Sequence, residues 1–447
     1  MKICLINPPV EDFYSTSLRR QPLGLLYVSS ALKNAGHDVS LINCHTPAKH
    51  IIPLPAEFHY LKKYMDEKKD QNFPFKNYYH FGMSYQEITR QLKETQADVY
   101  MISSLFTAYY QETAGIISII KIIKPDAVIA AGGYHAALYP EYFINDCGID
   151  YVITGEGEAG AIKLAGYLSG KNNIYDIPNL AYREGPVIKY TEKYYNDIDD
   201  ISFPDRGFLL RRDIRAYKKN FISMITSRGC PNRCGFCTGK AIWGTNYRTR
   251  NTESVIAEIE ECAIANGADI INFEDDNLFH SKDKASALLH GIISMKTKIK
   301  KDLEFTAMNG ISLENLDEEI LLLMNKAGFN ELNISLVTYS KNLQDDMGRP
   351  FDSGRFSRAA GKAKALGMNV RSYFILGLPE QTKQEIEDTI DFLKGLNIKV
   401  FPSVYYNVNS PREEWKMQRS SAFFNETAHL SRENLIGYFH ESMAEPG

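Results

Sequence analysis

The sequence predicts an α/β protein of two unlike halves. The first half reads as a doubly wound (Rossmann-like) domain, and the second as an open partial (β/α)6 barrel of the TIM type. Three observations lead to this prediction. The chain has 447 residues, about three times the usual domain size. Short Val- and Ile-rich runs alternate with helical patterns in both halves. A connecting region without this alternation, residues 172–215, separates the two halves.

The first half contains strand-like runs separated by helical patterns. The strand-like runs are Lys2–Ile6, Asp38–Ile42, Asp98–Ser103, Ala127–Ala131 and Tyr151–Thr154, and the helix candidates are Leu23–Ala35, Tyr85–Thr95 and Gln111–Ile123. Such alternation is typical of a parallel sheet covered on both faces, with a ligand beyond the carboxyl ends of the strands. Residues 45–84 show no clear period, so we interpret them as an insertion with a solvated charge run from Lys62 to Lys69.

The interruption at 172–215 is interpreted as a linker. Within it, the piece Asn179–Lys189 alternates around Glu184 and Gly185, which predicts a small hairpin. We therefore expect a first domain over 1–171, the linker over 172–215, a barrel over 216–406 and a helical C-terminal extension over 407–447.

The barrel half repeats the strand–helix unit. Its predicted strands are Phe221–Thr226, Asp269–Phe273, Leu303–Ala307, Leu332–Val337, Val370–Leu376 and Val400–Tyr405, with helices such as Thr252–Asn266, Glu318–Ala327, Ser353–Ala365 and Gln384–Leu396. A closed eight-fold barrel needs about 250 residues, so the shorter length available here favours an open one.

Composition excludes several classes of function. Lys and Arg number 51 against 55 Asp and Glu, so no basic excess supports a nucleic-acid partner. The apolar start Met1–Ile6 stops at Asn7, too early for a signal peptide, and no run of 18 apolar residues could span a membrane. We expect a cytoplasmic protein with no nucleic-acid or membrane partner.

The seven cysteines divide into two groups. Cys4, Cys44, Cys147 and Cys262 are scattered in apolar contexts, as buried structural thiols are. The other three, Cys230, Cys234 and Cys237, fall within eight residues after the first barrel strand. A structural zinc ion is normally bound by four protein ligands. Three thiolates on a [4Fe–4S] cluster instead leave one iron without a protein ligand. Zinc and inert thiols remain alternatives.

The motif Cys-x3-Cys-x2-Cys, with aromatic Phe236 before its last cysteine, resembles the radical S-adenosylmethionine (SAM) superfamily. The resemblance implies that Cys230, Cys234 and Cys237 hold a [4Fe–4S] cluster whose open iron chelates SAM. A reductant such as flavodoxin or ferredoxin would then drive cleavage of SAM to methionine and a 5′-deoxyadenosyl radical.

Later segments resemble the same superfamily with two departures. Gly377–Thr382 matches its Gly-x-Pro-Gly-Glu-Thr pattern, except that Glu380 stands at the second Gly and Gln381 at the Glu. The fourth strand lacks the glutamate that many relatives carry there. The residues expected to contact SAM are Phe236, Glu274, Asp275, Asn309, Ser335, Thr338 and Gly377. The acidic run 274–276 is also compatible with a solvated loop. Its position at the carboxyl end of a barrel strand favours a role in the active site instead.

The first half resembles a cobalamin-binding domain. Ser103-Ser104-Leu105, then 26 residues, then Gly132-Gly133 match two of the three landmarks of that fold, and further loops resemble those of cobalamin-binding radical SAM enzymes. The third landmark, Asp-x-His-x-x-Gly after the first strand, is missing, so no histidine there reaches cobalt. The expected cobalamin-binding residues are Pro8, Ser103, Ser104, Leu105, Gly132, Gly133, Tyr134, His135, Gly155 and Glu156.

Some assignments within this domain stay open. Phe106, Tyr109 and Tyr110 are either neighbours of the lower cobalt face or plain core residues. His135 is either a polar cofactor contact or a capped loop residue, and the C-terminal extension is either a lid or a structural cap.

The combined resemblance implies a class B, cobalamin-dependent radical SAM methyltransferase. It would methylate an unactivated carbon of a small molecule or natural product. The alternative is a radical rearrangement, cyclisation or dehydration on the same scaffold, with cobalamin redox-active or absent. A third interpretation is a binding protein that is stabilised by a metal ion and catalyses no reaction. No sequence feature indicates the substrate.

Overall fold

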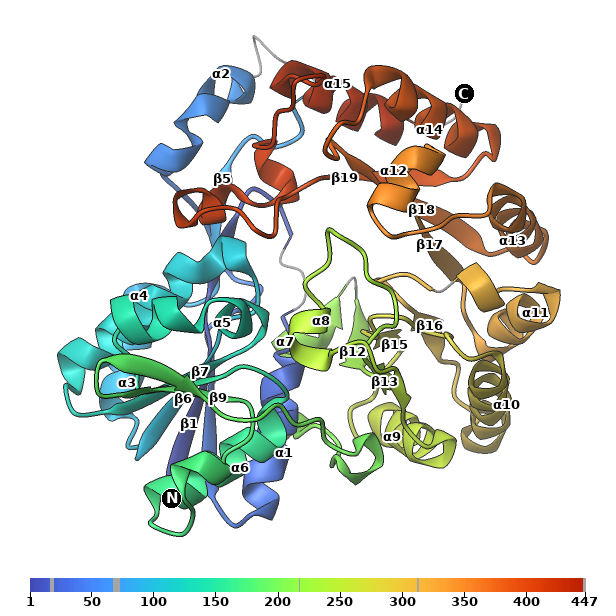
Figure 1. Ribbon diagram of the computed structural model, residues 1–447. Coiled ribbons are helices and arrows are strands. Elements are labelled where there is room, and N and C mark those ends of the chain that lie inside the picture. The colour runs from blue at the N-terminus through green and yellow to red at the C-terminus, as the bar shows by residue number, and fades with distance from the viewer. Residues whose placement is uncertain (17–19, 67–72, 217, 312, 445–447) are drawn as a thin grey trace.

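The computed structural model describes residues 1–16, 20–66, 73–216, 218–311 and 313–444. Two α/β halves lie side by side in Figure 1, and the C-terminal tail, drawn in red, returns across the top toward the first half. This arrangement brings the carboxyl ends of strands from both halves toward each other.

The first half is built on a seven-stranded sheet with the order β10-β9-β8-β7-β6-β1-β3. Its strands are β1 (Lys2–Asn7), β3 (Asp38–Asn43), β6 (Val99–Ser103), β7 (Val128–Gly132), β8 (Tyr151–Ile153), β9 (Leu180–Glu184) and β10 (Val187–Tyr190). The first five are parallel, as predicted. Because β3 and β6 flank β1 on opposite sides, the strand order reverses there, which is where doubly wound sheets bind ligands.

Alternate residues of β1 reach opposite faces of this sheet. Ile3 and Leu5 belong to the core that α1 (Leu23–Asn34) and α6 (Gly157–Leu168) cover, whereas Cys4 and Ile6 belong to the opposite core. The helices of that second face are α3 (Tyr85–Glu94), α4 (Tyr110–Ile123) and α5 (Tyr134–Leu138). The period of two in a strand therefore supplies both hydrophobic layers.

The predicted hairpin is present as β9 and β10, which pair antiparallel. However, β9 also pairs antiparallel with β8. The hairpin therefore extends the sheet of the first half, and does not stand apart within the linker as we expected.

The second half is an open barrel of six parallel strands in two groups of three. They are β12 (Lys219–Met224), β15 (Ile270–Phe273), β16 (Glu304–Thr306), β17 (Glu331–Val337), β18 (Asn369–Leu376) and β19 (Lys399–Val404). A single bridge, Phe305 to Phe329, joins the region of β16 to that of β17. The predicted six-unit partial barrel is confirmed.

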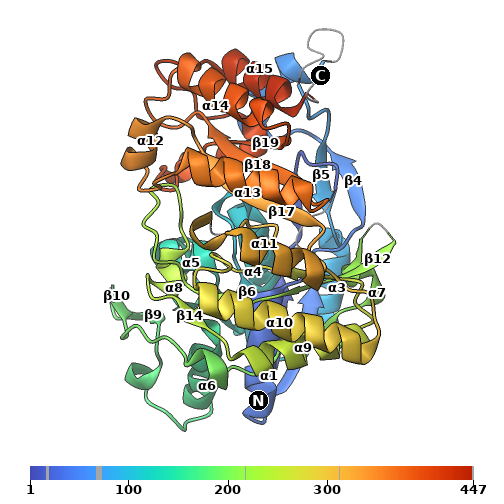
Figure 2. The ribbon, with the colours of Figure 1, turned by 90° about the vertical axis from the view of Figure 1, so that its right-hand side faces the viewer.

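Helices cover the outer side of this barrel, as Figure 2 shows. They are α9 (Thr252–Ile264), α10 (Lys282–Ile299), α11 (Glu318–Ala327), α13 (Ser353–Ala365) and α14 (Lys383–Gly395). Four of these helices are among the examples predicted from the sequence, and α10 completes the outer layer.

Residues 45–84, which we interpreted as an insertion, contribute to a small separate sheet. β4 (Lys49–Ile52) and β5 (Tyr78–Phe81) form a small sheet with β2 (Val10–Asp12). Phe73 and Phe75 pack against Phe423 of the tail, with ring centroids 5.7 and 6.2 Å apart. Lys62 and Lys63 in α2 (Lys62–Met65) are exposed as expected, whereas Lys68 and Lys69 lie outside the described residues.

The C-terminal tail ends in α15 (Arg432–Met443), which packs on β18 and β19. Figure 1 shows it beside α2 from the first half, where the Lys63 ammonium lies 2.9 Å from the Glu433 carboxylate. Among the described helices, none has the length and apolar character needed to cross a membrane.

Candidate active site between two strand edges

Cys230, Cys234 and Cys237 lie on one loop whose base is a two-stranded ladder. The strands of this ladder are β13 (Ser227–Arg228) and β14 (Arg248–Thr249). We call residues 229–247 between them the cysteine loop. Its first residue, Gly229, has φ +85°, and a Cβ there would lie 2.2 Å from the Asn246 carbonyl oxygen. Only glycine allows the loop to close in this way.

The three thiols differ in exposure. Cys234 is buried, Cys230 is half-buried and Cys237 is exposed. The Gly239 amide donates a hydrogen bond to the Cys237 sulfur at 3.4 Å. Desolvation, Asp276 and the two other cysteines raise the pKa of Cys237. A cationic centre would reverse this effect, because thiolates are the form that binds metals.

The donor set fits an iron–sulfur cluster better than a single ion. Within the described part of the chain, no group of three or more His, Cys, Asp or Glu converges on a point where one ion could sit. A [4Fe–4S] cluster does not require such convergence, because each thiolate binds a different iron. Three cysteines on one loop therefore leave the fourth iron without a protein thiolate.

Glu274 and Asn309 lie together at the ends of neighbouring strands. Glu274, after β15, accepts hydrogen bonds from the Asn272 amide at 2.6 Å and the Ser223 hydroxyl at 3.2 Å. The Asn309 amide donates to the Glu274 carbonyl at 3.0 Å. Glu274 is half-buried and Asn309 is exposed, so both stand at the open carboxyl edge of the barrel.

Asp275 points elsewhere. It is 1% exposed, and its carboxylate accepts hydrogen bonds from the Thr226 amide, the Thr226 hydroxyl and the Ser227 hydroxyl. Burial raises its pKa, and these hydrogen bonds oppose that rise. We predicted a SAM contact, but the side chain instead braces the turn that leads into the cysteine loop.

The fourth strand ends in an unusual backbone. Val337 has φ +68°, which β-branched residues rarely adopt, and the pairing of β17 with β18 shifts register between Ser335 and Val337. Ser335 stays half-buried at this edge. Thr338 is fully buried and its hydroxyl accepts from the Ser340 amide at 3.2 Å, so it serves the turn and does not face the open edge.

The loop after β18 accounts for the two substitutions, Glu380 and Gln381, in the Gly-x-Pro-Gly-Glu-Thr pattern. Glu380 takes φ +59°, the left-handed conformation that the pattern's glycine provides. The Gln381 side-chain oxygen accepts from the Gly377 amide at 2.7 Å and the Leu378 amide at 3.2 Å. The neutral amide thereby supplies an acceptor where the family has a carboxylate. Phe236, in the cysteine loop, is half-buried.

Arg349 is a site residue that the sequence reading missed. It follows Met347, whose carbonyl accepts from the Gly235 amide of the cysteine loop at 3.0 Å. Its guanidinium partly offsets the rise in the pKa of Cys230 that burial causes. Nothing in the cysteine spacing points to it, because it comes from a loop more than a hundred residues later.

In the first half, the loops after β6 and β7 touch through their backbones. The Ser104 amide donates to the Gly132 carbonyl at 2.7 Å, and a Cβ on Gly133 would lie 2.6 Å from the Ser104 oxygen. Beyond this contact, Leu105 and Phe106 are 44% and 42% exposed. The loop after β1 holds Pro8, which is buried, at the same strand-order reversal.

His135 belongs to an aromatic core. It is fully buried, its ring centroid lies 4.9 Å from that of Trp415, and burial lowers its pKa to about 3. It is thus a neutral packed residue. Tyr110 also packs on Trp415, and the Tyr109 hydroxyl donates to Asp12. Among the three candidates for the lower cobalt face, Phe106 is the exposed one.

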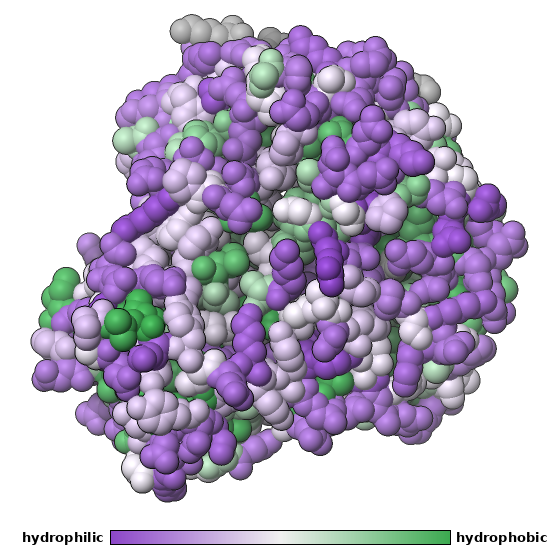
Figure 3. All heavy atoms as spheres, viewed as in Figure 1, coloured by the Kyte–Doolittle hydropathy of each residue, from purple (hydrophilic) through white to green (hydrophobic). Residues whose placement is uncertain are grey.

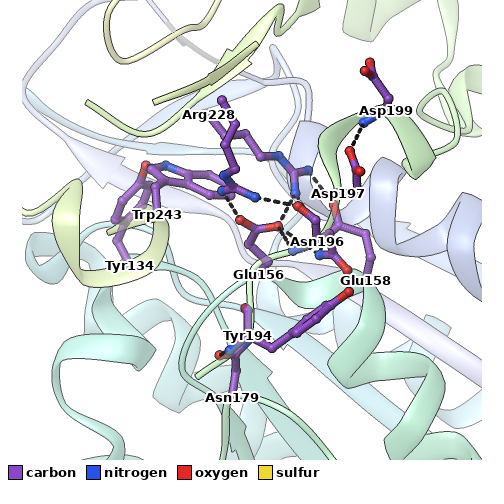
Figure 4. A network of polar contacts seen from close by, with 11 residues as sticks. Tyr134, Glu156, Glu158, Asn179, Tyr194, Asn196, Asp197, Asp199, Arg228 and Trp243 are labelled. Atoms are coloured by element: carbon purple, nitrogen blue, oxygen red, sulfur yellow. Dashed lines mark hydrogen bonds and ion pairs between the residues drawn. The ribbon is translucent and has the colours of Figure 1, made fainter. Parts of the chain in front are cut away.

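Tyr134 and Glu156 face the barrel, as Figure 4 shows. The Trp243 indole donates a hydrogen bond to the Tyr134 hydroxyl, and the Glu156 carboxylate pairs with Arg228 and Arg248. Gly155 packs against Asn179, whose side-chain carbon would lie 2.6 Å from an added Cβ. These residues, predicted to contact cobalamin, are occupied with contacts to the barrel and the linker.

Comparisons with known proteins agree with this architecture. The family model of the radical SAM superfamily matches residues 224–393, and that of the B12 binding domain matches residues 67–165. The chain is 26% identical over 412 residues to cytidylyl-2-hydroxyethylphosphonate methyltransferase of Streptomyces wedmorensis, covering 85% of this chain and 73% of that protein. It is 24% identical over 387 residues to hopanoid C-3 methylase of Methylococcus capsulatus, covering 82% of this chain and 64% of the relative.

Two solved structures share the fold. The radical SAM methyltransferase TsrM from Kitasatospora setae superposes with a TM-score of 0.68 at 17% identity, covering 91% of this chain and 73% of TsrM. The cobalamin-dependent SAM radical enzyme OxsB superposes with a TM-score of 0.68 at 16% identity, covering 96% of this chain and 58% of OxsB.

The fold and the cysteine loop thus define a radical SAM enzyme with an N-terminal B12-binding domain. The chain thus combines a radical SAM domain with a B12-binding domain. The two domains imply a [4Fe–4S] cluster, SAM and cobalamin as its cofactors.

Proposed function

We propose that this enzyme transfers a methyl group to an unactivated carbon of a small molecule. The observation that carries the proposal is a three-cysteine loop held against the carboxyl edge of a B12-binding sheet. The names of relatives support methyl transfer, since two of them are called a methyltransferase and a methylase. When bound, the cluster with SAM supplies a radical that abstracts hydrogen, and cobalamin supplies a methyl carrier.

Residues at two sites would take part in this reaction, one at the carboxyl edge of the barrel and one at the carboxyl edge of the B12-binding sheet. Cys230, Cys234 and Cys237 hold the cluster, and Asp275 keeps the entrance of their loop in place. Arg349 carries a positive charge near Cys230, which suits the carboxylate of SAM. Glu274 offers a carboxylate acceptor for an amino group at the same edge.

On the facing edge, the backbone contact between Ser104 and Gly133 leaves Leu105 and Phe106 exposed. An apolar surface at the reversal of strand order suits the corrin face, which is itself largely apolar. On the face seen in Figure 3, hydrophobic atoms show in the middle of the molecule, within a mostly hydrophilic surface. An exposed Cys237 leaves one side of the cluster loop accessible to a reductant such as flavodoxin or ferredoxin.

A second function is favoured by one comparison. The chain is 24% identical over 333 residues to the anaerobic magnesium-protoporphyrin IX monomethyl ester cyclase of Rubrivivax gelatinosus, covering 70% of this chain. A radical cyclisation or rearrangement on the same scaffold is therefore the alternative.

Counting products separates the two functions. Anaerobically reconstituted enzyme would be incubated with methyl-labelled SAM, a strong reductant and a panel of small molecules. Methyl transfer predicts S-adenosylhomocysteine and 5′-deoxyadenosine in equal amounts, with the label in a panel member. Turnover that yields 5′-deoxyadenosine and altered product without S-adenosylhomocysteine would support the alternative and contradict methyl transfer.

A further inference from the structure

The base of the cysteine loop places two like charges face to face. Arg228 on β13 is paired directly with Arg248 on β14. Opposed like charges on a ladder repel each other. Arg228 is 3% exposed, so water does not screen it. The ladder therefore requires anions close by.

The anions come from the B12-binding domain. Arg228 donates to Glu156 at 3.0 Å and to Glu158 at 2.5 Å, and Arg248 donates to the other oxygen of Glu156. The Asn196 amide of the linker donates to Glu156 at 2.9 Å and to Glu158 at 3.3 Å. Two positive and two negative side chains thus form one neutral set, and Figure 4 shows Arg228, Glu156 and Glu158 of this set at close range.

Aromatic rings close the same set. The Arg228 guanidinium lies 5.3 Å from the ring centroid of Tyr27 in α1 and 4.9 Å from that of Trp243 in the cysteine loop. Trp243 in turn donates to the Tyr134 hydroxyl at the start of α5. The cysteine loop is therefore held by the B12-binding domain both at its base and near its end.

We propose that Arg228, Arg248, Glu156 and Glu158 form an interdomain latch that positions the cysteine loop against the B12-binding sheet. The proposal rests on the proposed function, because it takes this loop as the cluster site and the β6–β7 edge as the cobalamin site. The four side chains are positioning residues. They act by fixing one cofactor site relative to the other.

The placement of the latch distinguishes it from an ordinary ion pair. Arg228 stands two residues before Cys230, and Arg248 stands eleven residues after Cys237. The latch therefore holds the loop at both of its ends. By contrast, the ion pair of Glu331 in β17 and Arg371 in β18, 2.7 Å apart, joins two neighbouring strands of the barrel itself. This pair provides a matched control.

The test compares Glu158→Gln with Glu331→Gln in enzyme loaded with iron, sulfide and hydroxocobalamin. Both substitutions remove one carboxylate charge from an arginine partner and keep the side-chain size. One-electron reduction of the cluster and of Co(III) gives a paramagnetic cluster and paramagnetic Co(II). The spin–spin interaction between these two centres appears as splitting and faster relaxation of the Co(II) EPR signal. This readout depends on relative position and requires no substrate.

The latch predicts a defined spin–spin interaction in the wild type and in Glu331→Gln. It predicts loss of that defined interaction in Glu158→Gln at unchanged iron and cobalt content. Arg248→Lys is the milder second variant if Glu158→Gln does not fold, since lysine keeps the charge but loses the planar fork. It should weaken the interaction in the same direction.

An unchanged interaction in a loaded latch variant would overturn the inference, and so would an equal loss in Glu331→Gln. Failure of the wild type to take up iron or cobalamin would instead contradict the proposed function. The two failures are therefore distinguishable.

Discussion

The carboxyl edge of the B12-binding sheet contains two neighbouring regions with opposite surroundings. After β8, Glu156 and Glu158 are buried, and both are paired with arginines of the barrel. After β6, Leu105 and Phe106 remain more than two-fifths exposed. One end of the edge is filled by protein, and the other is left open at the reversal of strand order.

This difference shows what a family-like motif can and cannot indicate. Both regions resemble loops of cobalamin-binding enzymes, so the sequence suggested the same ligand for both. Burial and charge separate them: a buried carboxylate needs a cation, and here the neighbouring domain supplies it. The exposed apolar side chains of Leu105 and Phe106 need no charged partner, and they can contact an apolar ligand.

The largest effect is expected from Cys234→Ser in the cysteine loop. Loss of one thiolate from a set of three should abolish cluster retention, so iron content and visible absorbance after anaerobic reconstitution should fall nearly to background. Cys262→Ser is the control, since that buried cysteine lies in α9 outside the loop. Full iron retention in Cys234→Ser would contradict the assigned cluster site.

A contrast between two buried glutamates sharpens the comparison. Glu156→Gln should destabilise the fold by about 3–5 kcal/mol, because it removes the anion of Arg248 and one of the two anions of Arg228. Glu112, in α4, has one carboxylate oxygen without a hydrogen-bond partner among the described residues, and burial raises its pKa to about 7. Glu112→Gln should therefore act in the opposite direction.

The sign of the Glu112 effect depends on pH. Its pKa is higher in the folded than in the unfolded state, so its contribution is fully present at pH 4 and is lost as pH rises through about 7. Denaturant unfolding should show Glu112→Gln more stable than wild type by roughly 1–3 kcal/mol at pH 8, and no gain at pH 4. If Glu112→Gln and wild type had the same free energy of unfolding at pH 8 as well as at pH 4, the buried carboxylate would ionise without a free-energy cost.

A smaller effect is expected from Gly133→Ala. The added Cβ would meet the Ser104 oxygen at 2.6 Å, and φ +104° strains any other residue. We expect a loss of about 1–3 kcal/mol together with weaker hydroxocobalamin binding, measured by thermal unfolding and absorbance titration. Gly170→Ala, with φ +74° and nothing within 4 Å, isolates backbone strain from the collision and should bind as wild type. Similar binding by both variants would remove the β6–β7 contact from the cobalamin site.

The smallest effect on stability is expected from Phe106→Ser. Because the ring is 42% exposed, unfolding free energy should change by no more than about 0.5 kcal/mol. Affinity for hydroxocobalamin should nevertheless fall. Ile122→Ser, at a side chain 78% exposed on α4, should change neither quantity. Unaltered affinity in Phe106→Ser would mean that the open end of the edge does not meet the corrin.

The sequence sufficed for the fold because local apolar patterns specify parallel strands and their helices. It also sufficed for the cysteine loop, where spacing alone carries the chemistry. It failed where partners are distant in the chain: Arg349 joins the site from another loop, and residues 45–84 bury aromatics against Phe423. It likewise left open the position of the tail, which Trp415 and Arg419 anchor on the first domain.

The most direct test of the account is anaerobic reconstitution of the wild-type chain with iron, sulfide and hydroxocobalamin, followed by SAM and a strong reductant. The account predicts about four irons and one cobalamin per chain, and reductive release of 5′-deoxyadenosine. A folded chain with its three loop cysteines intact that retains neither iron nor cobalamin, or leaves SAM uncleaved, would contradict it.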